Sequence, residues 1–583
     1  MKLSTAVRSL FIVILLMGCS QASAKDSRPN IFMLFTDDVT VWDHGCYGNP
    51  AVHTPNIDQL AREGMKFNHA LTPNPMCSPS RSAMYTGLYP FRNGAHPNWS
   101  KVKPGIKSIA HYMSSLGYRV LLFGKVHMWP AESFPFEHYP DDFGGSSGGG
   151  GPGPDMRRIL ADPGDKPLCI FCTKFGAHAF WPENPYGYDP NEVNIPAYHV
   201  DTPETREMRA HYYSAIHGLD EAVGKILELV RESGLEEHTL FIYSADHGSG
   251  WPHERQNLYD NGIKIPFIVR WPGHVEPGVE SEALVSLVDI VPTFIELAGG
   301  DVDQVVPKCG GEPLDGKSFL PVLLGEKKEH HEAVYGIISW GIMEGYPMRA
   351  VRTKTHKYIW NIDHQFKYPS MWAGLPYALQ YAKPVWDSWV EKAKTDPHAA
   401  ALIRAELYRP EEELYDIRED PYEMNNLADD PAHEEVLGQL SMKVRDWMKQ
   451  QGDDGSSEYH EEIGKDVKYL DKIYWRQPEV QVHITWVNSP ALSNDNLGKV
   501  EMTSPLWRAE IRYTLDGTEP TKESTLYTEP FVTGPTVIKA KAFDDGMETP
   551  VKVVDYTGMD FNFQFQTHYN PIHRGAGSPT ASW

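Results

Sequence analysis

Between residues 29 and 300 the chain alternates short apolar runs with longer amphipathic stretches, and this alternation restricts the fold more than any other feature. It is typical of a doubly wound α/β domain, in which helices cover both faces of a mostly parallel sheet. Residues 29–35 (PNIFMLF) are largely apolar, as expected of a strand buried on both faces. We expect further strands at residues 118–123, 168–173, 240–244 and 265–269.

Two helices are predicted between these strands. Thr54-Pro55 opens the first helix with a capping residue and a proline suited to the first turn, and Gly64 ends it. Apolar residues at helical spacing predict a second helix over residues 203–233. The glycine-rich segment 144–154 is expected to form a flexible surface loop.

With 583 residues the chain is too long for one hydrophobic core, so we expect two or three domains. Residues 348–361 alternate like a solvated antiparallel strand, and residues 413–427 read as a turn-rich connector before a helix at 431–450. Short Thr-, Val- and Tyr-rich runs beyond residue 475 indicate a small β-sandwich. The predicted division is a signal peptide (1–24), a large α/β domain (25–344), a smaller α+β subdomain (345–455), a linker (456–474), the sandwich (475–560) and a tail (561–583).

The N-terminus carries an export signal. Lys2 and Arg8 precede an apolar run, residues 10–17, which is too short to span a bilayer. Cleavage after the small-residue motif 22–24 would release a soluble protein, whereas the segment 16–19 resembles a bacterial lipoprotein box that would place a lipid on Cys19. Both alternatives predict export, to the periplasm or to the cell surface.

The net charge of −24 argues against a nucleic-acid partner, because phosphate binding needs clustered Lys and Arg. Any polyanionic substrate would have to meet a local basic pocket. Six cysteines are too few to form a disulfide scaffold in an exported chain of this length. Cys169 and Cys172 lie within one predicted strand without a second pair, so we interpret them as structural cysteines rather than as a metal or redox pair.

Charged and imidazole side chains follow four of the predicted strands. In chain order they are Asp37 and Asp38, Lys125 and His127, His178, and Asp246 and His247. One such residue is usually a helix cap or a structural histidine, but four strands that deliver them to one sheet edge indicate a functional site. Three converging aspartates repel one another unless a cation binds, which favours Ca²⁺ or Mg²⁺ over zinc.

The segment Cys77-Ser78-Pro79-Ser80-Arg81, followed by Thr86-Gly87, resembles the formylglycine signature of type I sulfatases. The resemblance implies that a maturation (formylglycine-generating) enzyme converts Cys77 to 3-oxoalanine. Pro79 suits the first turn of a helix, so residue 77 is expected at a helix N-terminus, where amide donors and the helix dipole favour an anion.

The resemblance extends over residues 28–450 and implies an alkaline-phosphatase-like mixed central sheet with flanking helices. Carried over by motif, it implies catalytic roles for Cys77, Arg81, Lys125, His127 and His178. It implies a Ca²⁺ ion, with Mg²⁺ possible, on Asp37, Asp38, the oxidised Cys77, Asp246 and His247. Arg255 stands near a position where the family usually has lysine, and is expected to bind substrate.

In the implied mechanism a hydroxyl of the hydrated aldehyde attacks sulfur while Arg81 and Lys125 stabilise the charge. His178 protonates the leaving oxygen or nitrogen, and His127 then deprotonates the remaining hydroxyl and expels sulfate.

The segment 255–262 (RQNLYDNG) resembles the sulfamidase-like and polysaccharide sulfatase branch, and residues 513–520 (YTLDGTEP) resemble the chitobiase-type C-terminal sandwich. Trp475, Trp486 and Trp507 of that region are either sugar contacts or core residues. We therefore expect an exported sulfatase that hydrolyses sulfate esters on a polysaccharide or its oligosaccharides. The alternatives are an N-sulfoglucosamine sulfohydrolase, a phosphonate or phosphate ester hydrolase, and an inactive glycan-binding protein. A two-zinc phosphatase would need Ser or Thr at position 77.

Overall fold

The computed structural model describes much of the chain between residues 28 and 557. The described residues are 28–140, 150–174, 176–178, 181, 183–340, 345–364, 368, 370, 372, 382–455, 481–486, 498–504, 510–533, 536–544, 547–549, 551–555 and 557. The predicted signal peptide with Cys19, most of the glycine-rich loop and the predicted tail lie outside these residues. Within the described part, no helix is both long enough and apolar enough to cross a bilayer.

An eight-stranded mixed sheet forms the centre of the large domain. Its order is β4-β3-β5-β1-β6-β7-β2-β8, and β7 alone runs antiparallel to its neighbours in this sheet. The strands are β1 (Asn30–Thr36), β2 (Met65–Leu71), β3 (Arg119–Gly124), β4 (Glu137–Tyr139), β5 (Leu168–Lys174), β6 (Thr239–Ala245), β7 (Phe267–Arg270) and β8 (Val279–Ser286). The five strands predicted in this region correspond to β1, β3, β5, β6 and β7.

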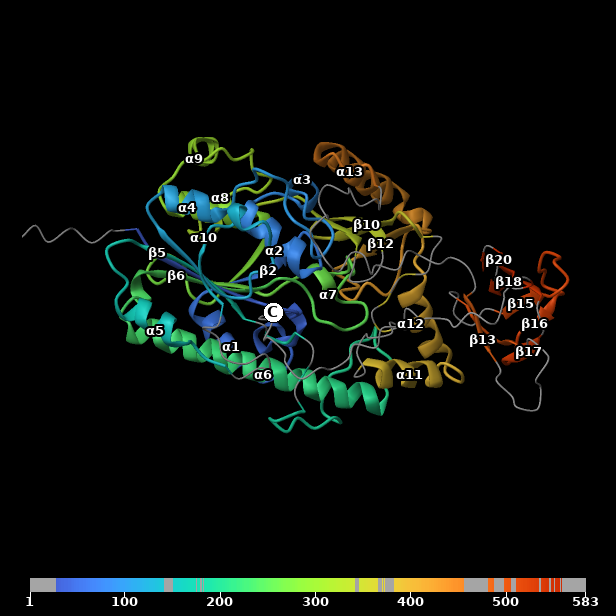
Figure 1. The fold of residues 1–583 in the computed structure, drawn as a ribbon. Coiled ribbons are helices and arrows are strands. Elements are labelled where there is room, and N and C mark those ends of the chain that lie inside the picture. The colour runs from blue at the N-terminus through green and yellow to red at the C-terminus, as the bar shows by residue number, and fades with distance from the viewer. Residues whose placement is uncertain are drawn as a thin grey trace, which may run out of the picture.

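Helices cover both faces of this sheet, as predicted for a doubly wound domain (Figure 1). One face carries α1 (Pro55–Glu63), α5 (Pro154–Ala161) and α6 (Pro203–Glu232). The other carries α2 (Cys77–Thr86), α4 (Ile109–Ser115), α8 (Ile290–Leu297), α9 (Val302–Lys308) and α10 (Leu320–Leu323). Single turns form α3 (Pro90–Asn93) and α7 (Asp260–Ile263). The helix predicted over 203–233 is α6, whose N-terminus is capped by the Thr202 hydroxyl.

The short 3-10 helices of the described part are η1 (Val41–Asp43), η2 (Gly45–Tyr47), η3 (Ala131–Ser133), η4 (Glu236–His238), η5 (Leu287–Asp289) and η6 (Pro431–His433).

A second, antiparallel sheet has the order β12-β11-β10-β9. Its strands are β9 (Val334–Trp340), β10 (Gly345–Arg352), β11 (His356–Asn361) and β12 (Glu412–Asp416), and it is accompanied by α11 (Ala382–Lys392), α12 (Pro397–Leu407) and α13 (Glu434–Gln451). The boundary expected at residues 344–345 falls inside this sheet, between β9 and β10.

Two expectations for this region were wrong. Residues 348–361 are not one solvated strand: β10 and β11 pair antiparallel across a turn at residues 353–355, and α13 packs against them. The polar side chains that suggested a solvated strand are buried in ion pairs, Arg349 with Asp453 and Lys357 with Asp260. The segment expected to be only a connector begins as β12, which pairs with β11.

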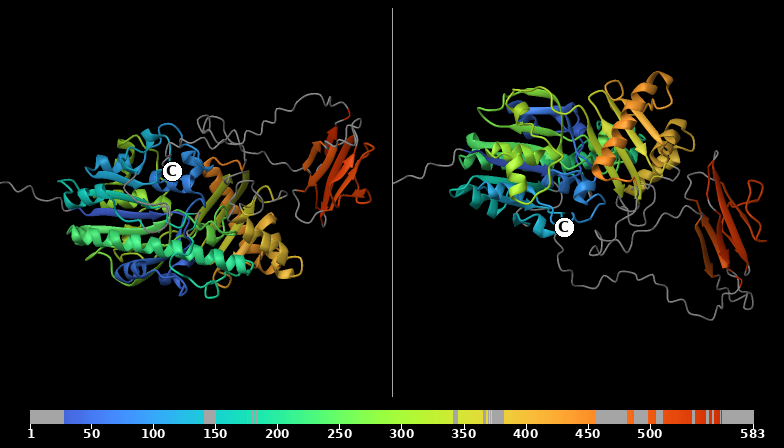
Figure 2. Two further views of the ribbon diagram at one scale, coloured as in Figure 1. Left: turned by 60° about the horizontal axis from the view of Figure 1, so that its bottom comes forward. Right: turned by 90° about the horizontal axis from the view of Figure 1, so that it is seen from above.

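The C-terminal strands form two facing sheets, drawn in red in Figure 2. One contains β13 (Gln481–Trp486), β14 (Gly498–Thr503) and β17 (Phe531–Thr533). The other contains β15 (Glu510–Thr514), β16 (Thr525–Leu526), β18 (Val537–Asp544), β19 (Met547–Glu548) and β20 (Lys552–Asp555). Their small core includes Val500, Ile511 and Ile538. Of the tryptophans considered as sugar contacts, Trp475 and Trp507 lie outside the described residues, and Trp486 is described only as the last residue of β13.

Candidate active site

The residues predicted to form a site lie after the C-terminal ends of neighbouring strands. Asp37 and Asp38 follow β1, and Asp246 and His247 follow the adjacent β6. Backbone hydrogen bonds continue the pairing past both strands, since Asp246 N donates to Thr36 O (2.9 Å) and Val39 N donates to His247 O (3.1 Å). Lys125 follows β3, and His178 comes four residues after the end of β5. Parallel pairing thus brings side chains from distant parts of the sequence to one edge.

Cys77 is the first residue of α2, as predicted, and is only 1% exposed. Its Sγ lies 3.3 Å from His247 Nε2 and 3.3 Å from Arg255 Nη2. Burial alone would raise the pKa of this thiol, but Lys125, Arg255 and His247 outweigh burial and hold the pKa well below its usual value. The position therefore stabilises negative charge, as a site for an anionic group requires.

Three buried aspartates meet three buried cationic side chains beside Cys77. Arg81 bridges two of them, with Nη2 2.7 Å from Asp37 Oδ1 and Nε 3.3 Å from Asp246 Oδ2. Lys125 Nζ lies 2.7 Å from Asp37 Oδ2. Arg255 Nη1 lies 2.8 Å from Asp38 Oδ2 and so connects that carboxylate to the sulfur of Cys77. Each of the three carboxylates therefore contacts at least one cationic side chain, which lowers the cost of burying it.

The carboxylates also fit a hard divalent cation. Asp38 Oδ1 is buried without a hydrogen-bond partner among the described residues, and His247 Nε2 lies 3.6 Å from it. The ligand atoms of Asp38, Cys77 and His247 lie within 4.8 Å of one another, as do those of Asp37, Cys77 and Asp246. Burial, and then Asp37, raise the pKa of Asp246 well above its usual value, so its ionised form requires additional positive charge. Oxygen-rich donor sets of this kind suit Ca²⁺ or Mg²⁺.

His247 is oriented for the same cluster. Its Nδ1 lies 2.8 Å from Gly248 O, so a neutral ring that donates from Nδ1 presents the lone pair of Nε2 to the carboxylates. Burial disfavours the charged ring, but Asp246 and the other anionic neighbours raise the pKa of His247 to about 9. A cation that displaced this proton would take over its electrostatic role.

The two remaining histidines have opposite electrostatic environments. Burial, and then Lys125, lower the pKa of His127 to about 4, so this ring is neutral near pH 7. Burial also favours the neutral form of His178, but Asp38, whose Oδ2 lies 3.9 Å from His178 Nε2, outweighs burial and raises the pKa. Two titratable groups whose pKa values are shifted in opposite directions are suited to act as a base and an acid.

Three residues near the site were not predicted from the sequence. Asn98 Oδ1 accepts a hydrogen bond from Ser78 N (3.3 Å) at the start of α2. Trp99 and Trp129 flank His127, with ring centroids 4.2 Å and 5.4 Å from it, and both are partly exposed. These residues lie on irregular segments, where no periodic pattern marks them. The left-handed backbone of Trp99 (φ 67°) could not be read from the sequence either.

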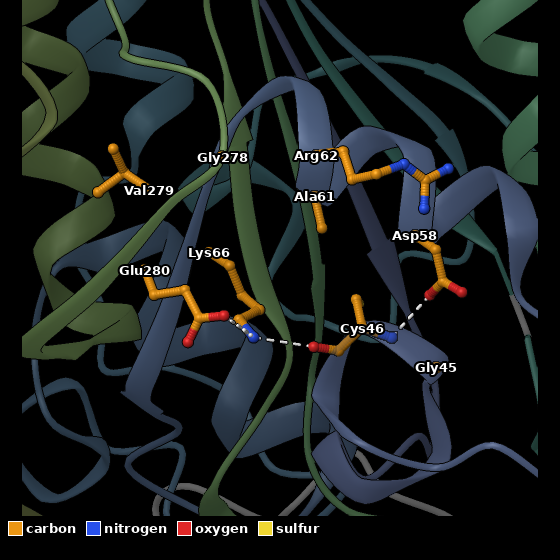
Figure 3. A pocket seen from close by; sticks show the side chains of 9 residues that line it. All are labelled: Gly45, Cys46, Asp58, Ala61, Arg62, Lys66, Gly278, Val279 and Glu280. Atoms are coloured by element: carbon orange, nitrogen blue, oxygen red, sulfur yellow. Dashed lines mark hydrogen bonds and ion pairs between the residues drawn. The ribbon is translucent and has the colours of Figure 1, made fainter.

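A pocket of about 310 Å³ lies at the other end of the strands (Figure 3). It is lined by residues near the beginnings of β2 and β8, including Lys66 and Glu280, whose charged groups lie 3.0 Å apart. None of the predicted catalytic or metal-binding residues lines it. The pocket and the predicted site residues therefore lie at opposite ends of the strands.

Comparison with known proteins identifies the family of the chain. Residues 29–150 and 154–300 match the family model described as "Sulfatase". An ulvan-active sulfatase from Formosa agariphila is 35% identical over 448 residues, which cover 74% of this chain and 82% of the relative. The chain belongs to the sulfatase family. It is a sulfuric ester hydrolase, and sulfatases generally use formylglycine and a divalent metal ion.

Further matches cover later parts of this sulfatase. Residues 247–372 match the model "N-sulphoglucosamine sulphohydrolase, C-terminal", and residues 493–554 match the "Chitobiase/beta-hexosaminidase C-terminal domain". The human N-sulphoglucosamine sulphohydrolase is 28% identical over 498 residues, covering 76% of this chain and 94% of the relative. These matches confirm the predicted family branch and the predicted type of C-terminal sandwich.

Solved structures confirm the predicted fold class. A structure in complex with its substrate, D-glucosamine-2-N,6-O-disulfate, superposes with a TM-score of 0.56 at 20% identity, covering 74% of this sulfatase and all of the other chain. The phosphonate monoester hydrolase of Agrobacterium radiobacter superposes with a TM-score of 0.52 at 19% identity, covering 75% of this sulfatase and 99% of the other chain. At these identities the likeness concerns the fold alone.

Proposed function

We propose that this sulfatase is exported and removes sulfate from a sulfated polysaccharide or its oligosaccharides, with residue 77 as a formylglycine nucleophile. The observation that carries the proposal is the position of Cys77. It begins a buried helix and lies 3.3 Å from both His247 and Arg255, beside three carboxylates. In this proposal a maturation enzyme converts Cys77 to formylglycine, and Sγ marks the place of the reactive oxygen.

Asp37, Asp38, Asp246 and His247, together with oxidised residue 77, would hold the divalent cation. We propose Ca²⁺ rather than Mg²⁺, since a set of carboxylates with one imidazole tolerates the looser calcium geometry better. When bound, the ion supplies positive charge beside the sulfate and beside residue 77.

The cationic residues of the cluster are proposed to bind the sulfate group. Arg255 already contacts Sγ, and its planar fork can bind two sulfate oxygens at once. Arg81 and Lys125 are held in place by Asp37 and would stabilise the charge that develops when an oxygen of residue 77 attacks sulfur. The attack forms one S–O bond and breaks the S–O bond to the sugar.

The histidines are proposed to move the protons. His178, whose pKa is raised, would donate a proton to the sugar oxygen as it leaves. His127, whose pKa of about 4 keeps it neutral, would accept a proton from the second hydroxyl of residue 77. Loss of that proton reforms the aldehyde as the bond between its carbon and the sulfate oxygen breaks, which releases sulfate without attack of water on sulfur. Addition of water to the aldehyde carbon then restores the hydroxyl nucleophile.

The substrate class is proposed from the relatives and from the aromatic residues beside His127. The 35% identical relative is named as ulvan-active, which makes a sulfated algal polysaccharide the first candidate. Trp99 and Trp129 offer partly exposed ring faces on which a sugar can stack. A second candidate is N-sulfoglucosamine, because residues 247–372 match the C-terminal model of the N-sulphoglucosamine sulphohydrolases.

We also propose that the six predicted segments of the chain are its functional units. The N-terminal segment would direct export to the periplasm or the cell surface, either as a cleaved signal peptide or through a lipid on Cys19. The separate sheets of the sandwich support its division from the rest, whereas the pairing of β9 with β10 favours a boundary before β9 in place of residues 344–345.

The test is sulfate release by enzyme coexpressed with a formylglycine-generating enzyme. Ulvan oligosaccharides, N-sulfoglucosamine, O-sulfated glycosaminoglycan fragments and a phosphonate monoester are supplied in parallel, and free anions are measured by ion chromatography. The proposal predicts release from an O-sulfated sugar and none by the Cys77→Ala variant. Turnover of the phosphonate alone would contradict it, and binding of sugars without turnover would support the inactive glycan-binding alternative.

A further inference from the structure

A second cluster of potential metal ligands lies away from the active site. It consists of Asp289, His330 and His331, whose ligand atoms lie within 4.8 Å of one another. Asp289 is the last residue of η5, directly after β8, and the two histidines belong to the segment that leads into β9. In the order of the central sheet β8 is four strands from β1, a separation of about 19 Å at the usual strand spacing.

Both imidazoles present Nε2 to the same carboxylate. His331 Nε2 lies 3.0 Å from each oxygen of Asp289, and His330 Nε2 lies 3.3 Å from Oδ2. In a tetrahedral zinc site with N and O ligands, neighbouring ligand atoms are separated by about 3.3 Å. The distances from Asp289 to the two imidazoles are therefore close to the spacing between corners of such a site, and all three ligand atoms lie within 4.8 Å of one another.

The carboxylate is fixed by its neighbours. Ser286 N donates to Asp289 Oδ2 (2.8 Å) and Lys317 N donates to Oδ1 (2.9 Å). The histidine segment is also anchored, because His331 N donates to Leu284 O on β8 (3.2 Å). Hydrogen bonds of this kind orient metal ligands before the ion arrives.

His330 gives an independent indication of a missing partner. Its side chain is only 7% exposed, and its Nε2 is buried without a hydrogen bond of good geometry among the described residues. The side chain of His331 is 14% exposed, which leaves an approach from solvent on its side. The Asp289 carboxylate already accepts two backbone hydrogen bonds. A cation shared by this carboxylate and His330 Nε2 would satisfy the buried nitrogen better than a further hydrogen bond to the carboxylate would.

We propose that Asp289, His330 and His331 bind a zinc ion, with a water molecule at the fourth position. Two imidazoles and one carboxylate favour zinc over calcium, so this site would differ in metal from the oxygen-rich cluster beside Cys77. The ion would connect the start of α8 in the large domain to the segment that enters the second sheet at β9. Its role is structural, and it does not depend on the reaction at Cys77.

The test uses the full-length enzyme without a histidine tag, stripped of metal and then saturated with Ca²⁺. ZnCl₂ is titrated by calorimetry, and CoCl₂ is added as a spectroscopic probe of tetrahedral geometry. The variants are His330→Gln and His331→Gln, which keep an amide able to hydrogen-bond Asp289, and the control is His274→Gln at an exposed histidine.

We expect the wild type and the His274 variant to bind one Zn²⁺, to show tetrahedral Co²⁺ bands, and to gain a few degrees in unfolding midpoint with excess Zn²⁺. Each of the two cluster variants should lose the bands and the zinc-dependent shift. Absence of Co²⁺ bands and of zinc binding in the wild type would overturn the proposal. An equal zinc-dependent shift in the wild type and in both cluster variants would also overturn it.

Discussion

Charged residues are arranged differently at the two ends of the strands of the central sheet. At the C-terminal ends of the strands, Asp37, Arg81 and Asp246 are completely buried. They belong to three separate parts of the chain, after β1, in α2 and after β6. At the N-terminal ends of the strands, Lys66 and Glu280 form an ion pair between the neighbouring strands β2 and β8, beside a pocket of about 310 Å³, and Glu280 is largely exposed. The comparison teaches that neither a pocket nor an ion pair alone identifies the candidate active site of this sulfatase. What distinguishes the candidate active site is that buried charges from several elements converge on Cys77, whose pKa they lower.

The largest effect is expected from removing the nucleophile. Cys77→Ala should lower kcat by at least about 10³-fold, because the remaining groups bind sulfate but cannot attack it. The fold should persist, since alanine is a good helix former and α2 keeps its other contacts. Activity and circular dichroism are measured together, with Cys309→Ala as the control at a distant, partly buried cysteine. Retained turnover in the Cys77 variant would show that residue 77 is not the nucleophile.

Removal of the divalent metal is expected to have the next largest effect. Chelation should lower activity by roughly 10²-fold or more and lower the unfolding midpoint, because the carboxylates of the C-terminal edge lose a bound ligand of the folded state. Added Ca²⁺ should restore both, and Asp38→Asn should weaken the restoration. Activity unaffected by prolonged chelation, with metal content verified, would contradict the proposed cation.

The role of His178 predicts an effect that depends on the leaving group. His178→Asn should reduce kcat/KM for a sugar sulfate by roughly 10²-fold, but much less for an aryl sulfate, whose leaving group needs no proton. Because the pKa of His178 is raised, its acid form persists above pH 6.5, and activity on sugars should fall as pH rises through that raised value. The aryl sulfate should lack this alkaline limb. Equal losses on both substrates would assign His178 a role other than proton donation.

The smallest effect on activity and stability is expected at the N-terminal ends of the strands. Glu280→Ala should change kcat/KM by less than about twofold and the free energy of unfolding by less than about 1 kcal/mol, because exposed ion pairs contribute little. Activity assays and denaturant unfolding measure both quantities. A loss of activity comparable with that of the Asp38 variant would contradict the distinction between the two ends of the strands.

Much of this arrangement follows from the sequence because parallel strands deliver their C-terminal residues to one edge. The acids after β1 and β6 can therefore be grouped from the sequence, whereas Cys77 was joined to them by its resemblance to the formylglycine signature. The strands β2 and β8 were not predicted, since β2 (MKFNHAL) and β8 (VESEALVS) mix polar with apolar residues where they are partly exposed. Arg349 and Lys357 misled the prediction for the second sheet, because their burial depends on acids that are distant in sequence. The pairing of Asp289 with two histidines depends on the same kind of long-range contact.

The most direct test of the account is the chemical state of residue 77 in active enzyme. Peptide mass spectrometry, with a hydrazine to trap aldehydes, measures the fraction of residue 77 converted to formylglycine in preparations made with and without the maturation enzyme. The account predicts that kcat rises in proportion to this fraction and reaches zero without it. Full activity in a preparation whose residue 77 is entirely an unmodified thiol would contradict it.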